Sequence, residues 1–227
     1  MKKYLISLTL LCVFGMACFA QTEDKPAGIK PSPELEALTT AHSLAKYGYA
    51  NYSASALIGA AEILSQVSIQ KAQLEKEAEA EKAENTGTKT DKPEITLAGL
   101  IADAKKFAAG DATMLAWADR VEKAGAESAT RGPVGGPSCF NGRVYANRVF
   151  VYHCTFRGGM TARVYVSGDG DTDLDLYVYD ANGNFIGSDD DYTDECVVMW
   201  TPRYTGSFTI RVVNRGNVYN DFQLCTY

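Results

Sequence analysis

The sequence predicts an α+β chain in two parts, with N-terminal helical hairpins followed by a C-terminal antiparallel β-sandwich or jelly roll. Residues 33–126 are rich in Ala, Leu, Glu and Lys, and their apolar residues recur at helical spacing. Residues 141–227 are rich in Val, Tyr, Thr, Asp, Asn and Gly, and apolar residues there alternate with polar ones. A Gly- and Pro-rich stretch at 131–137 separates the two compositions, so we expect a linker over residues 127–140.

The first part contains start and stop signals for helices. Ser32 is a candidate N-cap, and Gly48 lies near the expected end of the first helix. A second helix is expected to begin near Asn51 or Ser53, with an Ala-, Glu- and Lys-rich tail that extends as solvated helix to Glu84. Two further helices are expected over residues 97–109 and 112–123. Weak similarities at an offset of about sixty residues favour two similar hairpins, packed as a small bundle or as a repeat pair.

The second part reads as a series of short strands. The expected strands are residues 144–149, 150–156, 162–167, 174–179, 184–187, 196–201, 207–213 and 221–226. Asn182-Gly183 is a strong hairpin-turn signal between two of them. Seven or eight short strands with one apolar face each predict a sandwich or jelly roll.

The most distinctive segment is acidic. Strict alternation places Leu174, Leu176 and Val178 on one face of a strand, and two aspartates and two tyrosines on the other. No Lys or Arg occurs between Asp169 and Glu195, so these carboxylates repel one another unless a cation lies among them. We therefore expect a Ca²⁺ site, because Ca²⁺ prefers oxygen ligands; a solvated acidic face without an ion is the alternative. The candidate ligands are Asp171, Asp173, Asp175, Asp189, Asp190 and Asp191.

The N-terminus predicts export. Residues 1–20 combine Lys2 and Lys3 with a short apolar run, which is typical of a signal peptide cleaved after Ala20. Lipidation of Cys18 is the alternative, although the preceding residues fit a lipoprotein signal poorly. The mature protein is then expected in the periplasm or outside the cell. No other apolar run has the eighteen or so residues that a membrane-spanning helix needs.

Four cysteines remain after the signal peptide, and an oxidising compartment predicts two disulfides. The strand pattern gives a weak preference for pairing Cys154 with Cys196 across the sandwich interior, which leaves Cys139 for Cys225. The other two pairings remain open. A zinc site is not expected, because the cysteines form no close Cys-x-x-Cys pair.

The overall charge narrows the choice of partner. The formal net charge is −6, and removal of the signal-peptide lysines makes it more negative. This balance argues against nucleic acid or an anionic membrane surface as the main partner. It is compatible with solubility and with cation binding.

The acidic segment belongs to a longer series of matching blocks. They are Gly168–Asp180, Asn182–Asn184, Ser188–Asp191, Trp200–Pro202, Gly206–Val212 and Asn214. In order and spacing, the span from about residue 148 to 227 resembles the bacterial pre-peptidase C-terminal domain, a small sandwich appended to many secreted hydrolases. The resemblance implies a jelly-roll-like fold, often calcium-stabilised, that serves secretion, solubility, attachment or assembly. The helical part is vaguely similar to tetratricopeptide-type helix pairs but lacks their signature residues.

Catalytic signatures are weak. The sequence has two histidines, of which His42 is expected on a helix surface and His153 facing away from the sandwich core. It has no Gly-x-Ser-x-Gly elbow, no His-Glu-x-x-His helix and no phosphate-binding loop. We therefore predict no catalytic residues, and a hydrolase with an unrecognised site is the least favoured alternative.

The leading hypothesis is an exported, non-catalytic binding or assembly protein with a calcium-stabilised sandwich module. The alternative is an adhesion module for carbohydrate or protein. Its contact face would contain Tyr177 and Tyr179, flanked by Tyr165, beside the aspartates of the same strand. The expected partner in either case is an envelope or extracellular protein or glycan.

Overall fold

The computed structural model describes residues 32–71, 82–90, 92–130 and 136–227. The expected signal peptide, Cys18 and residues 72–81 of the expected helical tail lie outside the described residues. The described parts of that tail are not helical, because Lys71 belongs to a short strand and residues 82–84 form a loop, so the expected helical extension to Glu84 is wrong there. None of the described helices is both long and apolar enough to cross a membrane.

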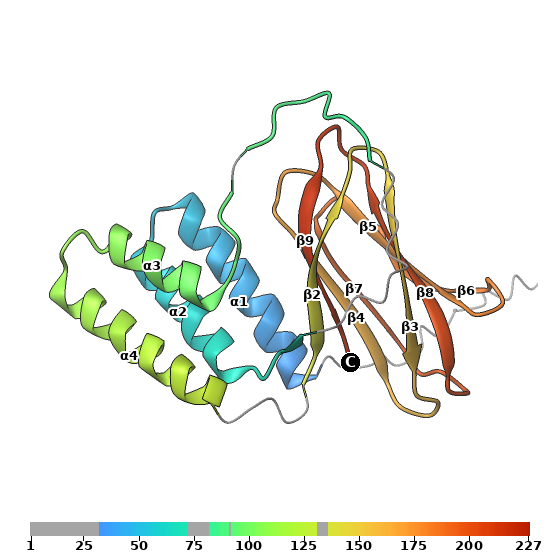
Figure 1. The fold of residues 1–227 in the computed structure, drawn as a ribbon, viewed down its shortest axis with the longest axis horizontal. Coiled ribbons are helices and arrows are strands. Elements are labelled where there is room, and N and C mark those ends of the chain that lie inside the picture. Colours follow the sequence, from blue (N-terminus) through green and yellow to red (C-terminus); the bar gives the residue numbers. More distant parts are fainter. Residues whose placement is uncertain (1–31, 72–81, 91, 131–135) are drawn as a thin grey trace, which may run out of the picture.

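Four helices form a layer at one side of the molecule (Figure 1). They are α1 (Pro33–Ala50), α2 (Ala54–Gln66), α3 (Leu97–Phe107) and α4 (Ala112–Thr130). Ser32 and Ser53 cap α1 and α2, with their hydroxyl oxygens accepting from the amides of Leu35 at 3.2 Å and Ala56 at 3.3 Å. Helix α4 continues to Thr130, so the expected end at residue 123 and the expected linker from 127 are both wrong.

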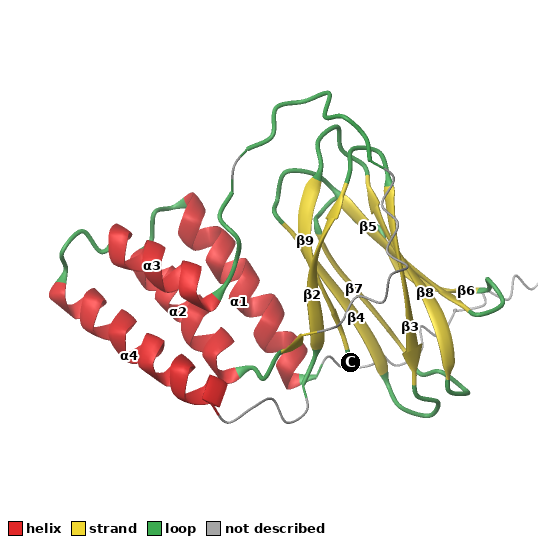
Figure 2. Ribbon diagram, in the orientation of Figure 1, coloured by secondary structure: helices red, strands yellow, loops and turns green. Residues whose placement is uncertain are grey.

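The second part is a sandwich of two sheets (Figure 2). One sheet has the order β1-β2-β9-β4-β7 and the other has the order β3-β8-β5-β6. All pairings are antiparallel except that of the two-residue strand β1 with β2. The strands are β1 (Gln70–Lys71), β2 (Ser138–Val144), β3 (Val149–Phe156), β4 (Ala162–Gly168), β5 (Leu174–Asp180), β6 (Phe185–Asp189), β7 (Glu195–Trp200), β8 (Gly206–Asn214) and β9 (Asn220–Thr226).

The strand expected at residues 144–149 is wrong. The strand in this region is β2, which begins inside the expected linker, and residues 145–148 turn the chain into β3. The sequence hides β2 because Asn141 and Gly142, which are poor strand formers, lie at its centre. Gly142 is required there, since an added Cβ would come within 2.7 Å of the Phe222 ring on β9.

The molecule has two separate hydrophobic cores, one inside the sandwich and one between the sandwich and the helices. Leu174, Leu176 and Val178 are fully buried between the two sheets, on the face that the alternation predicts. A second core lies between the helices and the outer face of the five-stranded sheet, where Leu38 of α1 and Tyr165 of β4 belong to one buried cluster. The helical layer and the sandwich are therefore packed directly against each other.

A long connection also joins the two parts. We call residues 82–90 and 92–96 the strap; it leads from the β8–β9 end of the sandwich to the start of α3 (Figure 1). The amide of Thr86 donates to the carbonyl of Asn217 at 2.9 Å, and the side chain of Asn85 accepts from the amide of Tyr219 at 2.9 Å. The strap is thus anchored on the loop between β8 and β9.

Candidate functional site: a cleft between the helices and the sandwich

A cleft with a cavity volume of about 1280 Å³ lies where the helical layer, the strap and the five-stranded sheet meet. Helix α1, the turn after it and the C-terminal end of α3 form one wall. Strands β2, β4 and β9 form the opposite wall, and the strap contributes residues from Thr90 to Ile95. Because the lining comes from segments distant in the sequence, no single motif could have predicted this site.

The helical wall carries three aromatic rings. The ring of Phe107 lies 6.4 Å from that of Tyr49 and 5.4 Å from that of Tyr52, both in edge-on geometry. Tyr52 is 76% exposed and has a positive φ of 51°, in the turn that joins α1 to α2. The Tyr49 hydroxyl donates to Asp103 at 3.2 Å, and burial together with this carboxylate raises the pKa of Tyr49.

The charged side chains of the cleft already have partners. Lys46 contacts Asp194 at 2.9 Å and Glu195 at 3.0 Å. Arg143 donates two hydrogen bonds to the carboxylate of Asp221, of 2.6 and 2.8 Å. The remaining contacts are Lys106–Asp103 at 2.7 Å, Lys92–Asp171 at 2.7 Å, Lys89–Asp169, and a hydrogen bond from the Asn141 amide to Glu94.

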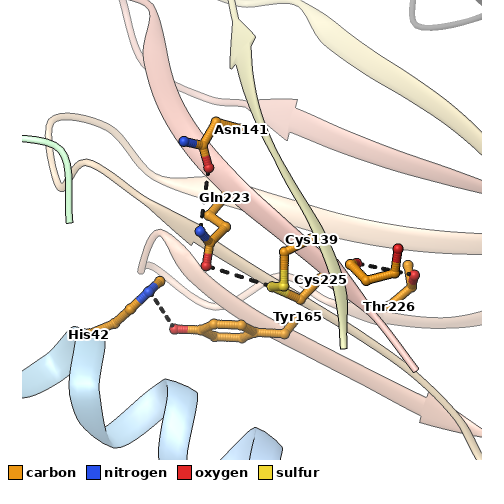
Figure 3. Close-up of a disulfide and its surroundings, with 8 residues drawn as sticks. His42, Cys139, Asn141, Tyr165, Gln223, Cys225 and Thr226 are labelled. Atoms are coloured by element: carbon orange, nitrogen blue, oxygen red, sulfur yellow. Dashed lines mark hydrogen bonds between the residues drawn. A yellow bond between two sulfur atoms is a disulfide. The ribbon is translucent and has the colours of Figure 1, made fainter. Parts of the chain in front are cut away.

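His42 is not a surface residue, which corrects the sequence-based expectation. It is only 2% exposed, and its Nδ1 lies 3.2 Å from the hydroxyl of Tyr165 (Figure 3). Burial, and then the charge of Lys46, lower the pKa of His42 to about 4, so the imidazole is neutral at physiological pH. Its Nε2 is buried and has no hydrogen-bond partner among the described residues.

The sequence carried a signal for both members of this pair. His42 falls in register with the buried residues Leu35, Leu38 and Ala45 of α1, at spacings of three and four. The centre of strand β4 is the unbroken apolar run Val164-Tyr165-Val166, which is typical of a strand covered on both faces, and Tyr165 faces the helices from its outer side. Tyr165 therefore does not flank Tyr177, which lies in the other sheet.

The acidic segment receives cations from distant parts of the chain. Lys89 of the strap pairs with Asp169, and also with Asp171 at 2.7 Å. On the strand itself, the Asp175 carboxylate accepts from Arg215 Nε at 2.6 Å. Two of the expected calcium ligands, Asp171 and Asp175, therefore have cationic partners from within the protein.

Among the described residues, no Lys or Arg forms an ion pair with the other carboxylates of the set, although the charge of Arg215 acts on Asp173 from a distance. Asp173 Oδ1 is buried without a hydrogen-bond partner in the described part of the chain. Burial, and then the charges of Asp175 and Asp191, raise the pKa of Asp173. Burial also raises the pKa of Asp189, although its carboxylate accepts from the amide of Val197 at 2.8 Å.

The remaining members of the acidic set lie in or beside the turn before β7. Asp191 accepts from the amide of Thr193 at 2.9 Å, and Asp190 lies 3.5 Å from the hydroxyl of Tyr177. No three of the described His, Cys, Asp and Glu residues are already arranged as metal ligands. Calcium binding thus stays a prediction.

The two tyrosines of the expected contact face are half-buried on the outer side of the four-stranded sheet. The Tyr177 hydroxyl donates to Asp175 at 3.1 Å and accepts from Arg215 at 3.2 Å. Tyr179 packs its ring 5.9 Å from that of Phe185. These contacts hold both side chains against the sheet.

One of the two preferred disulfides is present. Cys139 of β2 and Cys225 of β9 are directly opposite each other and are bonded (Figure 3). Cys154 and Cys196 are free thiols, so the second expected bridge is wrong.

The position of each free cysteine along its strand explains this difference. The rings of Phe156 and Trp200 lie 4.7 Å apart and so mark the same end of β3 and β7. Cys154 is two residues from that end and Cys196 is four, so the two are offset by roughly 7 Å along the strand direction. This offset adds to the spacing of roughly 10 Å between the two sheets. That separation exceeds the reach of a disulfide. The Cys196 thiol instead donates to the carbonyl of Leu174 at 3.0 Å.

Comparison with known proteins gave likeness in structure only. No family model and no curated protein matches the chain. The pre-peptidase C-terminal domain of a Bacillus anthracis collagenase is 12% identical, covers 41% of this chain and 91% of that chain, and gives a TM-score of 0.34. The periplasmic g-type lysozyme inhibitor PliG of Aeromonas hydrophila is 14% identical, covers 40% of this chain and 83% of that chain, and gives a TM-score of 0.32. Scores this low carry no argument about function.

Proposed function

We propose that this chain is an exported, non-catalytic binding protein whose ligand site is the cleft between the helices and the sandwich. The single observation that carries this proposal is the cleft itself, a cavity of about 1280 Å³ with aromatic rings on one wall and polar side chains on the other. Apolar and aromatic lining with a few convergent polar groups is typical of small-ligand sites. The expected ligand is a glycan or protein segment of the cell envelope or its surroundings.

The contacts of the reactive side chains support a non-catalytic role. His42 bonds to Tyr165, and His153 lies 3.1 Å from the hydroxyl of Thr209 on the neighbouring strand. Burial raises the pKa of Cys154 to about 12, and it raises the pKa of Cys196 as well, so both thiols are poor nucleophiles at neutral pH.

The Cys139–Cys225 disulfide supports export, because structural disulfides persist mainly in oxidising compartments. The sequence blocks that resemble the pre-peptidase C-terminal domain, a domain appended to many secreted hydrolases, also support export. N-terminal sequencing of the mature protein tests this part of the proposal. We expect the sequence to begin at Gln21; a start at Met1 would contradict export, and a lipid-modified Cys18 would replace the soluble form with an anchored one.

The binding proposal is tested by nuclear magnetic resonance of the isotope-labelled mature protein. Soluble polysaccharide and protein fractions of a bacterial envelope are added separately, and backbone amide shifts are followed. We expect shifts at cleft residues such as Lys106 and Gln223. Shifts confined to Tyr177 and Tyr179 would move the site to the sheet face, and no shift with either fraction would overturn the proposal.

We also propose that Ca²⁺ stabilises the acidic end of the sandwich. Asp173 Oδ1, buried without a hydrogen-bond partner in the described structure, supports this, as do the raised pKa values of Asp173 and Asp189. The carboxylates that would hold the ion are Asp173, Asp189, Asp190 and Asp191 rather than the whole expected set. Lysine and arginine side chains of the protein already neutralise Asp171 and Asp175. Ca²⁺ would do the same for the four carboxylates that hold it.

A further inference from the structure

We infer that the cleft is built for a neutral oligosaccharide, one that stacks on Tyr52 and Phe107 and places hydroxyl groups between Asn141, Gln223 and His42. This inference rests on the proposed function and names the class of its ligand. Three independent features of the cleft support it: its charge balance, its exposed aromatic ring and its neutral polar groups.

The charge balance disfavours an ionic ligand. Four basic and four acidic side chains line the cleft, which gives no net charge of its own. The basic groups already form ion pairs. Arg143 binds Asp221 through two hydrogen bonds, and Lys46 pairs with Asp194. An anionic ligand that drew Lys46 away would leave the largely buried Asp194 carboxylate uncompensated, whereas an uncharged ligand leaves every pair intact.

The aromatic wall offers a stacking surface. Tyr52 keeps a ring that is 76% exposed at the edge of the cleft, edge-on to Phe107. The turn fixes this position, since the amide of Ser53 donates to the carbonyl of Gly48 at 2.9 Å and holds the chain through the positive φ of Tyr52. The fixed backbone presents the ring toward the cleft, and the C–H faces of a sugar ring match its apolar face.

The polar wall consists of groups that suit hydroxyls. The side-chain amide of Gln223 donates to the Asn141 oxygen at 3.4 Å (Figure 3), and the Asn141 nitrogen donates to Glu94. Each amide nitrogen carries a second hydrogen and each oxygen a second lone pair, which remain for hydroxyl groups. The neutral imidazole of His42 has a buried Nε2 without a partner among the described residues. A hydroxyl donates to Nε2 when the ring proton is on Nδ1, and accepts from Nε2 in the other tautomer. A ligand with many hydroxyls therefore satisfies a buried atom that otherwise has no partner.

Titration calorimetry of the mature protein tests the inference. The probes are neutral hexasaccharides of the β-glucan, xylan and mannan types, an acidic oligogalacturonate of equal length, and an acidic peptide. We expect a neutral oligomer to bind and the two acidic probes to bind at least tenfold more weakly. Affinity is expected to change less than twofold between low and high salt, since the charges of the cleft are paired internally.

Variants locate the site. Tyr52→Ala is expected to weaken binding about tenfold. Tyr52→Asn also removes the ring, but asparagine tolerates the positive φ, so a loss of binding in this variant is not caused by a misfolded turn. Tyr47→Ala is the matched control, because Tyr47 is an exposed tyrosine of α1 that does not line the cleft. Unchanged affinity in both Tyr52 variants would overturn the inference, as would salt-sensitive binding of an acidic probe alone.

The outcome separates the ligand class from the function. If no neutral oligosaccharide binds while an envelope protein shifts the cleft amides, the ligand class is wrong and the proposed function stands. If neither fraction nor any oligosaccharide binds, both fail.

Discussion

Asp171 and Asp173 lie two residues apart in the turn that leads into β5, yet their surroundings affect them in opposite ways. Burial works against ionisation of Asp171, but the ion pairs from Lys89 and Lys92 outweigh it and lower the pKa of this carboxyl. Asp173 experiences burial and the charges of Asp175 and Asp191, which raise its pKa. The surroundings thus stabilise the ionised carboxylate of Asp171 and destabilise that of Asp173.

The difference shows where the positive charge comes from. Lys89 and Lys92 belong to the strap, roughly eighty residues earlier in the chain than the acidic turn. The Lys89 ammonium also lies 4.6 Å from the centre of the Tyr219 ring. A local run of carboxylates without Lys or Arg is therefore compensated on one side by the fold itself, and the calcium proposal concerns only the other side.

The largest expected effect comes from removing the cation of the compensated side. Lys89→Gln leaves two largely buried carboxylates, those of Asp169 and Asp171, short of positive charge. We expect the free energy of unfolding to fall by about 2 kcal/mol, measured by urea denaturation at pH 7. Lys82→Gln is the matched control, an exposed lysine of the same strap, and should change nothing. Equal stability of the two variants would mean that the strap does not compensate the acidic turn.

Calcium should act on the other side and by a smaller amount. At ten times its dissociation constant, an ion that binds only the folded state adds about 1.4 kcal/mol. We expect millimolar Ca²⁺ to raise the melting temperature relative to excess EDTA, and Asp173→Asn to abolish that rise. Calorimetry with Mg²⁺ in place of Ca²⁺ is the control. An identical melting temperature in Ca²⁺ and EDTA contradicts the calcium proposal.

Much of the fold followed from the sequence, because the elements with regular spacing obey local rules. Helices α1 and α3 agree with their predicted ranges to within a few residues, and most strands agree as well, whereas α2 begins as predicted but ends at Gln66, before the expected tail. Strand β2 was missed, since Gly142 is dictated by the ring of Phe222 on another strand rather than by any local preference. Helix α4 was predicted too short, because its last turns are Ala-, Glu- and Ser-rich and lack the apolar spacing that marked its start.

The candidate site was much less accessible to sequence reasoning. The alternation correctly placed Leu174, Leu176 and Val178 in the core, but it could not show that lysines from the strap reach Asp169 and Asp171. The cleft depends on how the helical layer lies on the five-stranded sheet, and that arrangement is a tertiary property. Composition suggested two independent parts, whereas His42 and Tyr165 join them in one buried core.

A subtler change should relieve the strain at the uncompensated side. Asp173→Asn removes a carboxylate whose pKa is raised, so in EDTA at pH 7 we expect a gain of roughly 0.5 kcal/mol after allowing for solvent screening. The folded protein holds this proton more tightly than the unfolded chain, so the penalty is complete above the folded pKa and is lost only when the pH lies below the unfolded pKa. The gain should therefore shrink in urea denaturation as the pH falls and vanish only well below pH 3.8, the ordinary pKa of an aspartate, where both states are protonated. A gain that is independent of pH would point to a cause other than this charge.

The smallest effect is expected where an ion pair is exposed. Lys105 of α3 lies 2.8 Å from Asp119 and 2.7 Å from Glu122 of α4, a geometry much like that of Lys89 with its two aspartates. Water surrounds these carboxylates, whose side chains are more than half exposed, so they need no fixed cation. We expect Lys105→Gln to leave the urea midpoint unchanged at low and at high salt. If it destabilised the protein as much as Lys89→Gln, distance rather than burial would determine the value of these pairs, and the contrast between Asp171 and Asp173 would need another explanation.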